Sequence, residues 1–353
     1  MDEGCEKLSP HILVTGGCGF IGSHTIRALL NDKKVKKLVN LDSLTYSGNP
    51  QNLSDVASDI RYKFVKNSIN NIEILKKVIS EDKINIIIHF AAESHVDRSI
   101  NSVEPFIKTN IDGTRVILEC IRYFKNKNRI VHLIHISTDE VYGSLGPNDP
   151  PFLESNNIDP RNPYAATKAA SDMLVNSFVN TYQLSCCISR CSNNYGPNQF
   201  PEKLIPLIVL NCMENKPLPV YGDGMQIRDW IHVQDHANGI IKLMYALYEG
   251  IISSGEVVNF GANNELTNME IIETIINLTG ADKNLIKFIE DRPGHDKRYA
   301  MGYGKAKEIL NWEPIISWEK GIIDVVNWYI SNSSWVESIR TNEYRKWINH
   351  HYG

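Results

Sequence analysis

Short apolar runs alternate with helical patterns over the first 190 residues, and this alternation restricts the folds that the chain can adopt. The apolar runs cover residues 11–15, 37–41, 60–65, 84–90, 130–136 and 185–190. Amphipathic segments lie between them, and the longest cover 105–124 and 163–182. Strands that alternate with helices favour a parallel sheet with helices on both faces. The sequence therefore predicts an α/β fold with a Rossmann-type, doubly wound parallel sheet.

A glycine-rich turn follows the first apolar run. Gly16, Gly19 and Gly22 permit a tight turn and let the backbone approach a pyrophosphate, and the helix that follows supplies amide donors for the phosphates. The next strand ends at Asp42, where a carboxylate suits the ribose hydroxyls of NAD and repels the extra phosphate of NADP. Glycines alone are weak evidence, but strand, turn, helix, strand and acid in register predict an NAD site.

The pattern changes after residue 190. Asn193 to Pro197 predicts a loop, and prolines interrupt the segment that follows. We therefore expect an NAD-binding domain over 1–190 and a smaller mixed α/β, mainly substrate-binding domain over 191–353. A segment at about 230–262 is expected to return to the larger sheet.

Several acid–base groups gather around one predicted strand end. Thr138, Asp139 and Glu140 directly follow the run 130–136, and Tyr164 precedes Lys168 by four residues on a predicted helix. That spacing puts the phenol and the amine on one helix face. A hydroxyl, two carboxyls, a phenol and an amine at one edge of a sheet can carry out several proton transfers.

Composition excludes several classes of protein. The net charge is −4 over 353 residues, which gives no indication of a nucleic-acid or membrane partner. No apolar run approaches the length of a membrane span, and the N-terminal residues lack the apolar segment of a signal peptide. We therefore expect a cytoplasmic location as the default. The number of cysteines, seven, is odd and includes no C-x-x-C pair, so we expect reduced thiols and no metal site.

These motifs together resemble a known family. T-G-G-x-G-F-I-G, S-T-D-E-V-Y-G and Y-x-x-x-K resemble the extended short-chain dehydrogenase/reductases and, within them, the nucleotide-sugar 4,6-dehydratases. The stretches 44–49, 92–99, 201–206, 227–230 and 291–299 carry the resemblance further. Related 4-epimerases lack the pair Asp139-Glu140, and decarboxylases and GDP-mannose dehydratases usually have Ser before the Glu. The pair therefore indicates a dTDP- or UDP-hexose dehydratase.

The resemblance implies a hydro-lyase reaction with NAD as a regenerated cofactor: dTDP-glucose would become dTDP-4-keto-6-deoxyglucose. Tyr164 would take the C4 hydroxyl proton with Thr138 bonded to that oxygen, Glu140 would take the C5 proton, and protonated Asp139 would donate to the departing C6 hydroxyl. Lys168 and the positive charge of the nicotinamide would lower the pKa of Tyr164 towards neutral pH. The alternatives are the same reaction on UDP-glucose, a nucleotide-sugar epimerase or decarboxylase, and an inactive sensor of such ligands.

The resemblance also implies binding residues and an oligomer. The predicted cofactor contacts are Gly16, Gly19, Phe20, Ile21, Gly22, Asp42, Ser68, Ile69, Ala91, Ala92, Ser94, Thr109, Tyr164, Lys168 and Asn194. The predicted substrate contacts are Ser94, Thr138, Asn193, Lys203, Leu204, Tyr221, Arg228, Asn263, Arg292, His295 and Tyr352. Ser68 departs from the family, which usually has an Asp there to contact adenine. Family members are typically homodimers that pair through two long helices, here 105–124 and 163–182.

Overall fold

A seven-stranded parallel sheet forms the larger part of the protein, as seen in a computed structural model that describes residues 9–340. The strand order is β10-β6-β5-β4-β1-β2-β3, and every neighbouring pair is parallel. The strands are β1 (His11–Thr15), β2 (Lys37–Asp42), β3 (Tyr62–Lys66), β4 (Ile86–His89), β5 (His132–Thr138), β6 (Cys186–Cys191) and β10 (Val257–Phe260). The order reverses beside β1, because β2 lies on one side of it and β4 on the other.

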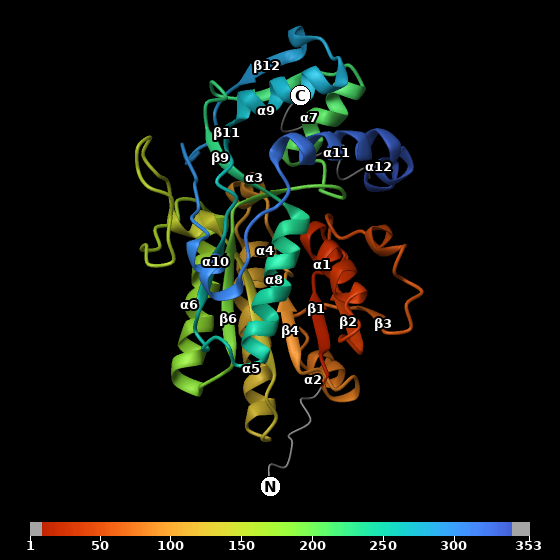
Figure 1. Ribbon diagram of the computed structural model, residues 1–353, viewed down its shortest axis with the longest axis vertical. Helices are drawn as coiled ribbons and strands as arrows, with labels where there is room; N and C mark the ends of the chain where they lie inside the picture. The colour runs from red at the N-terminus through yellow and green to blue at the C-terminus, as the bar shows by residue number, and fades with distance from the viewer. Residues whose placement is uncertain (1–8, 341–353) are drawn as a thin grey trace.

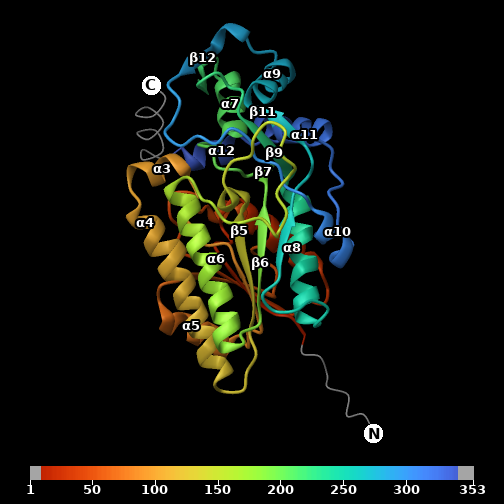
Figure 2. The ribbon, with the colours of Figure 1, turned by 90° about the vertical axis from the view of Figure 1, so that its left-hand side faces the viewer.

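Helices cover both faces of this sheet, which confirms the predicted doubly wound fold. On one face lie α1 (Phe20–Asn31) and α8 (Val233–Tyr248), and their apolar residues share a core with β1, β4 and β5. On the other face lie α2 (Ile72–Glu81), α5 (Thr114–Lys125) and α6 (Pro163–Tyr182). Figures 1 and 2 show α5 and α6 side by side on one face and α8 on the other.

A second group of elements lies at one end of the sheet (Figure 1). They form a three-stranded sheet of order β11-β9-β7 and a two-stranded sheet of β12 and β8, packed with four helices. Their bounds are β7 (Asn193–Tyr195), α7 (Leu204–Met213), β8 (Leu218–Tyr221), β9 (Ile227–His232), β11 (Glu265–Thr267), α9 (Asn268–Thr279), β12 (Ile286–Ile289), α11 (Trp318–Ser331) and α12 (Ser333–Ile339). A separate apolar core, with Ile208, Ile272, Val325 and Tyr329 at its centre, holds this smaller part together.

Short elements connect these layers. They are η1 (Pro50–Leu53), α3 (Val96–Asn101), η3 (Asp139–Tyr142), η4 (Lys283–Leu285) and α10 (Gly304–Leu310). The helix α6 begins where the sequence predicts, because Asn162 caps it by accepting from the Ala165 amide at 2.8 Å and Pro163 occupies the first turn.

The helix predicted over 105–124 is helical throughout but not uniformly an α-helix. It runs from α4 (Glu104–Phe106) through a π-helical segment, η2 (Ile107–Gly113), into α5. The buried Asn110 lies in that segment and bonds the backbone of Glu93 and, at 2.9 Å, the hydroxyl of Thr167. Such wide turns are rare and occur often at functional sites. Between residues 9 and 340, no helix is both long enough and apolar enough to cross a membrane.

Candidate active site

A cavity of about 420 Å³ lies at the carboxyl ends of the parallel strands, between the larger sheet and the smaller part. The segments after β1, β2, β4, β5 and β6 form one side, and α7, β8, β9 and the segment 292–299 contribute to the other. In open parallel sheets, ligands bind outside the carboxyl ends of the strands, at the point where the strand order reverses. The cavity occupies that position beside β1 and β4.

The glycine turn after β1 leaves no room for larger residues. Gly16 has a φ of +71°, and a Cβ atom there would lie 2.6 Å from the Ala91 amide nitrogen. A Cβ atom on Gly22 would lie 2.5 Å from the Gly16 carbonyl oxygen. Gly19 occupies the N-cap of α1 and provides no side-chain cap, which leaves the first helix amides for another acceptor. The turn therefore has the form that a dinucleotide pyrophosphate requires.

Asp42 borders the same cavity at the end of β2. Its carboxylate accepts from the amides of Cys18 at 2.9 Å and Leu44 at 2.8 Å, and these bonds fix its position. Burial raises the pKa of Asp42, and the two amide bonds oppose that rise. A fixed acid at this end of β2 matches the place of the ribose-binding acid in NAD sites.

The acidic pair sits on a tight turn at the end of β5. The Thr138 hydroxyl donates to Oδ1 of Asp139 at 3.0 Å and accepts from the Glu140 amide at 3.3 Å. Burial raises the pKa of Asp139 to about 8, and the neighbouring Glu140 adds to the rise. Asp139 is therefore protonated at neutral pH. The Glu140 carboxylate accepts from the Asn162 side chain at 3.0 Å, at the start of α6.

Tyr164 and Lys168 line the cavity from the first turns of α6. Both side chains are almost fully buried, and the ammonium of Lys168 donates to the Ile136 carbonyl at 2.6 Å. Burial, followed by the charge of Glu140, raises the pKa of Tyr164 well above its usual value. The pKa that Lys168 and the nicotinamide charge would set together stays a prediction, because in the protein by itself burial decides the direction of the shift. Burial lowers the pKa of Lys168 itself to about 8.

Cationic side chains mark the end of the cavity formed by the smaller part. Arg228 is buried, and its guanidinium donates to the carbonyls of Ile227 at 2.8 Å and Asp296 at 2.9 Å. Arg292 forms a 2.9 Å ion pair with Asp97, and the Lys203 ammonium donates to the Ser94 carbonyl at 3.0 Å. Guanidinium groups bind phosphates through paired donors, so this end suits a diphosphate.

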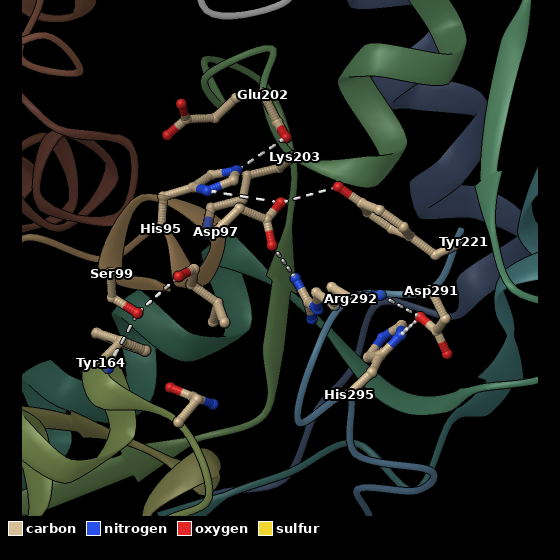
Figure 3. A network of polar contacts seen from close by, with 12 residues as sticks. His95, Asp97, Ser99, Tyr164, Glu202, Lys203, Tyr221, Asp291, Arg292 and His295 are labelled. Carbon is tan, nitrogen blue, oxygen red and sulfur yellow. Dashed lines mark hydrogen bonds and ion pairs between the residues drawn. The ribbon is translucent and has the colours of Figure 1, made fainter. Parts of the chain in front are cut away.

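Figure 3 shows how the residues around Arg292 are held. Asp97, from α3, accepts from the Tyr221 hydroxyl at 3.2 Å as well as from Arg292. In the same view the ring of His295 bonds Asp291 at 2.6 Å. Side chains from the larger part, from β8 and from the loop after β12 therefore meet in one polar network.

The structure brings nearly all the predicted site residues into this single cavity. Every predicted cofactor contact and catalytic residue lines it, as do the predicted substrate contacts Ser94, Asn193, Lys203, Leu204, Tyr221, Arg228, Arg292 and His295. Asn263 does not line it, because it lies exposed at a left-handed bend (φ 52°) between β10 and β11. Asn268, at the start of α9, lines the cavity instead. Tyr352 lies outside the described residues.

Sequence reasoning missed other lining residues, among them Asp97, Glu202 and Tyr299. All three lie within the stretches 92–99, 201–206 and 291–299 that carry the family resemblance, so the resemblance was the signal that could have found them. Tyr299 is 3% exposed and lies beneath Arg228, whose guanidinium carbon is 4.5 Å from the ring centroid.

A doubly wound sheet, a glycine turn at its reversal point and a Tyr–Lys pair in one cavity define an enzyme of the extended short-chain dehydrogenase/reductase type. The sequence model of the family described as GDP-mannose 4,6 dehydratase matches residues 13–325. A dTDP-glucose 4,6-dehydratase of Neisseria meningitidis is 43% identical over 95% of this chain and 97% of its own length. The chain belongs to this dehydratase family, on its dTDP-glucose 4,6-dehydratase branch.

Solved structures agree with this assignment. A dTDP-glucose 4,6-dehydratase from Bacillus anthracis, crystallised with NAD, is 43% identical and covers 94% of this chain and 100% of its own, with a TM-score of 0.85. The corresponding enzyme from Streptomyces venezuelae, also crystallised with NAD, is 41% identical with the same coverage and a TM-score of 0.88.

Proposed function

We propose that the protein catalyses the NAD-dependent dehydration of dTDP-glucose to dTDP-4-keto-6-deoxyglucose. One observation carries the proposal: a buried, protonated Asp139 adjoins Glu140 in the cavity that also holds Tyr164 and Lys168. Dehydration next to a transient ketone needs both an acid and a base, whereas oxidation at C4 alone needs neither carboxyl. The dehydratase relatives of this chain support the same reaction.

The residues present fit NAD as the resident cofactor. Added Cβ atoms on Gly16 and Gly22 would fill the turn where a pyrophosphate would approach, and Asp42 is fixed at the ribose position. Phe20, Ile21, Ser68 and Thr109 line the same cavity. NAD held there would supply the hydride acceptor for C4 of the sugar and the hydride donor for C6, so that a full turnover would leave the cofactor unchanged.

The first proton transfer is assigned to Tyr164. Its phenolate takes the proton of the C4 hydroxyl while Thr138, which adjoins it, holds the C4 oxygen. Burial disfavours the phenolate, so the site needs positive charge beside it. Lys168, four residues along α6 on the same face, is the cation that the chain supplies.

The elimination is assigned to the acidic pair. A ketone at C4 makes the C5 proton acidic, and Glu140 removes it. Asp139 donates its proton to the C6 hydroxyl, which departs as water. The pKa of Asp139 at about 8 leaves this proton in place at neutral pH. Adjacent carboxyls thus act as a base and an acid because burial favours the neutral form of one of them.

The nucleotide end of the substrate is assigned to the smaller part. Arg228, Arg292 and Lys203 face the diphosphate, and apolar side chains of Leu207, Val220 and Ile272 line the cavity between α7, β8 and α9. An apolar lining favours the methyl group of thymine over the bare uracil ring. A contact of that size is worth about 1–3 kcal/mol, so we expect dTDP-glucose to be preferred over UDP-glucose by roughly tenfold to two-hundredfold in kcat/KM.

The test is to incubate the purified protein with dTDP-glucose and, separately, with UDP-glucose, and to follow each by mass spectrometry. We expect loss of one water from dTDP-glucose, faster than from UDP-glucose, with no net change in the amount of reduced cofactor. An unchanged mass with epimerised sugar would indicate an epimerase, and loss of carbon dioxide from a uronate would indicate a decarboxylase. No reaction with added NAD would leave only a binding role.

We further propose a cytoplasmic homodimer that pairs through the outer faces of η2, α5 and α6. Exposed apolar side chains there include Ile107, Tyr123, Met173 and Tyr182, and Met173 is 57% exposed. Such a row on two packed helices favours burial against a second copy. The six described cysteines are buried free thiols, as in a reducing compartment.

Light scattering should give twice the monomer mass of 40.0 kDa, and Met173→Glu should shift it towards the monomer. A monomer at micromolar concentration would refute the pairing.

A further inference from the structure

A buried polar cluster lies directly behind Lys168, outside the cavity. Asp172 follows Lys168 by one turn of α6 and is fully buried. Its Oδ2 atom pairs with Nε of Arg190, on β6, at 2.9 Å, and its Oδ1 atom lies 3.5 Å from Nε2 of His135, on β5. The hydroxyl of Ser171 lies 3.1 Å from the same His135 nitrogen. None of these side chains touches the cavity, so the proposed reaction does not use them directly.

A lysine buried to this extent needs compensation for its lost hydration. The ammonium of Lys168 donates to the Ile136 carbonyl, which is a neutral acceptor. A carbonyl bond alone does not repay the desolvation of a charge, and an ammonium without an anion nearby releases its proton. Asp172 on the same helix face is positioned to supply that anion.

Several other ionisable groups near Lys168 carry no charge at neutral pH. Burial holds the pKa of His135 at about 4 and that of His89, on β4, well below its usual value, so both rings are neutral. Burial raises the pKa of the Cys191 thiol, on β6. Tyr164, one turn before Lys168 on α6, and Asp139, after β5, are also protonated, whereas the charge of Glu140 lies at the cavity and acts on Tyr164. Asp172 and Arg190 are therefore the charged side chains packed behind Lys168.

We propose that Asp172 is the counter-ion that keeps Lys168 in its ammonium form at neutral pH, with Arg190 holding the carboxylate in place. Asp172 is thus a positioning residue, and this role rests on the function proposed above for Lys168. Arg190 stands on the far side of Asp172, with its guanidinium carbon 4.7 Å from the Tyr142 ring centroid. This role explains why the chain buries the Asp172–Arg190 ion pair here. The fold alone does not need the pair, because apolar residues at such positions stabilise a protein equally well.

Two matched variants change the charge behind Lys168, and neither leaves the buried Arg190 without its carboxylate partner. The double variant Asp172→Asn with Arg190→Gln removes both charges together, and the single variant Arg190→Gln frees the carboxylate to act on Lys168. We expect the alkaline limb of the kcat profile to move to lower pH by about one unit or more in the double variant. In Arg190→Gln it should not move to lower pH, because the carboxylate remains beside Lys168 and Asp139 still loses its proton near pH 8. Equal profiles in all three proteins, whatever their rates, would overturn the proposal.

A second measurement needs no turnover. Lys168 has a pKa of about 8 in the folded protein against 10.5 unfolded, so folding releases protons between these values and stability from this group rises with pH there. Removing the Asp172 carboxylate lowers the pKa of Lys168 in the folded protein, so the pH range over which stability rises begins at a lower pH. The thermal midpoint of the double variant, relative to the native protein, should therefore rise between about pH 6 and 8. A difference between the two thermal midpoints that does not change with pH would overturn the proposal. Because this measurement needs no turnover, it stays decisive even if the protein proved inactive and the proposed reaction failed.

Discussion

Replacing Tyr164 by phenylalanine should lower turnover of dTDP-glucose by about a hundredfold to ten-thousandfold, the usual contribution of a positioned acid–base group. The change removes only the hydroxyl, and the ring keeps its edge contact with Phe106, whose centroid lies 6.3 Å away. Without the phenolate no side chain takes the C4 hydroxyl proton, so the first step fails. The other side chains predicted to hold the cofactor are untouched.

Steady-state rates by mass spectrometry and NAD affinity by calorimetry check this result together. The matched control is Tyr245→Phe, which removes a hydroxyl bonded to Asp32 at 2.6 Å, far from the cavity, and should leave kcat within about twofold. Turnover that survives in Tyr164→Phe would remove Tyr164 from the mechanism. A parallel loss of NAD affinity would show that the phenol acts in binding.

The parts of the fold that the sequence predicts are those that local physics determines. Buried parallel strands have continuous apolar runs, so β1, β5 and β6 lie where the runs lie. The Asn-Pro start of α6 is a local cap signal, and that helix has the predicted bounds. The π-helical segment could not be predicted, because it depends on bonds from Asn110 to Glu93 and Thr167, which are distant in sequence.

The same limit applies to the site. The Tyr–Lys spacing and the glycine turn are local, and the structure places both in the cavity. The ion pair between Asp97 and Arg292 joins residues 195 positions apart, and no pattern in one sequence indicates it. The pKa of Tyr164 is likewise a property of the packed site: spacing brings Lys168 near, but burial and Glu140 decide the direction of the shift.

Replacing Asp139 by asparagine separates the two halves of the proposed elimination. Asparagine has nearly the same shape and can still accept from Thr138, but it cannot donate a proton to the departing C6 hydroxyl. We expect the rate of water loss to fall by about a hundredfold or more. Removal of the C5 proton by Glu140 should continue, so dTDP-glucose recovered from deuterated water should carry deuterium at C5.

The pH dependence of the native enzyme provides an independent check on this acid. Because burial raises the pKa of Asp139 to about 8, the acid form dominates at neutral pH and is lost as pH rises through that value. Water loss should therefore decline on the alkaline side, while deuterium exchange at C5 should decline less. Asp149→Asn, which removes an exposed carboxyl outside the cavity, is the control and should match the native profile. Equal loss of exchange and elimination in Asp139→Asn would mean that this carboxyl acts before the elimination, in orienting the sugar.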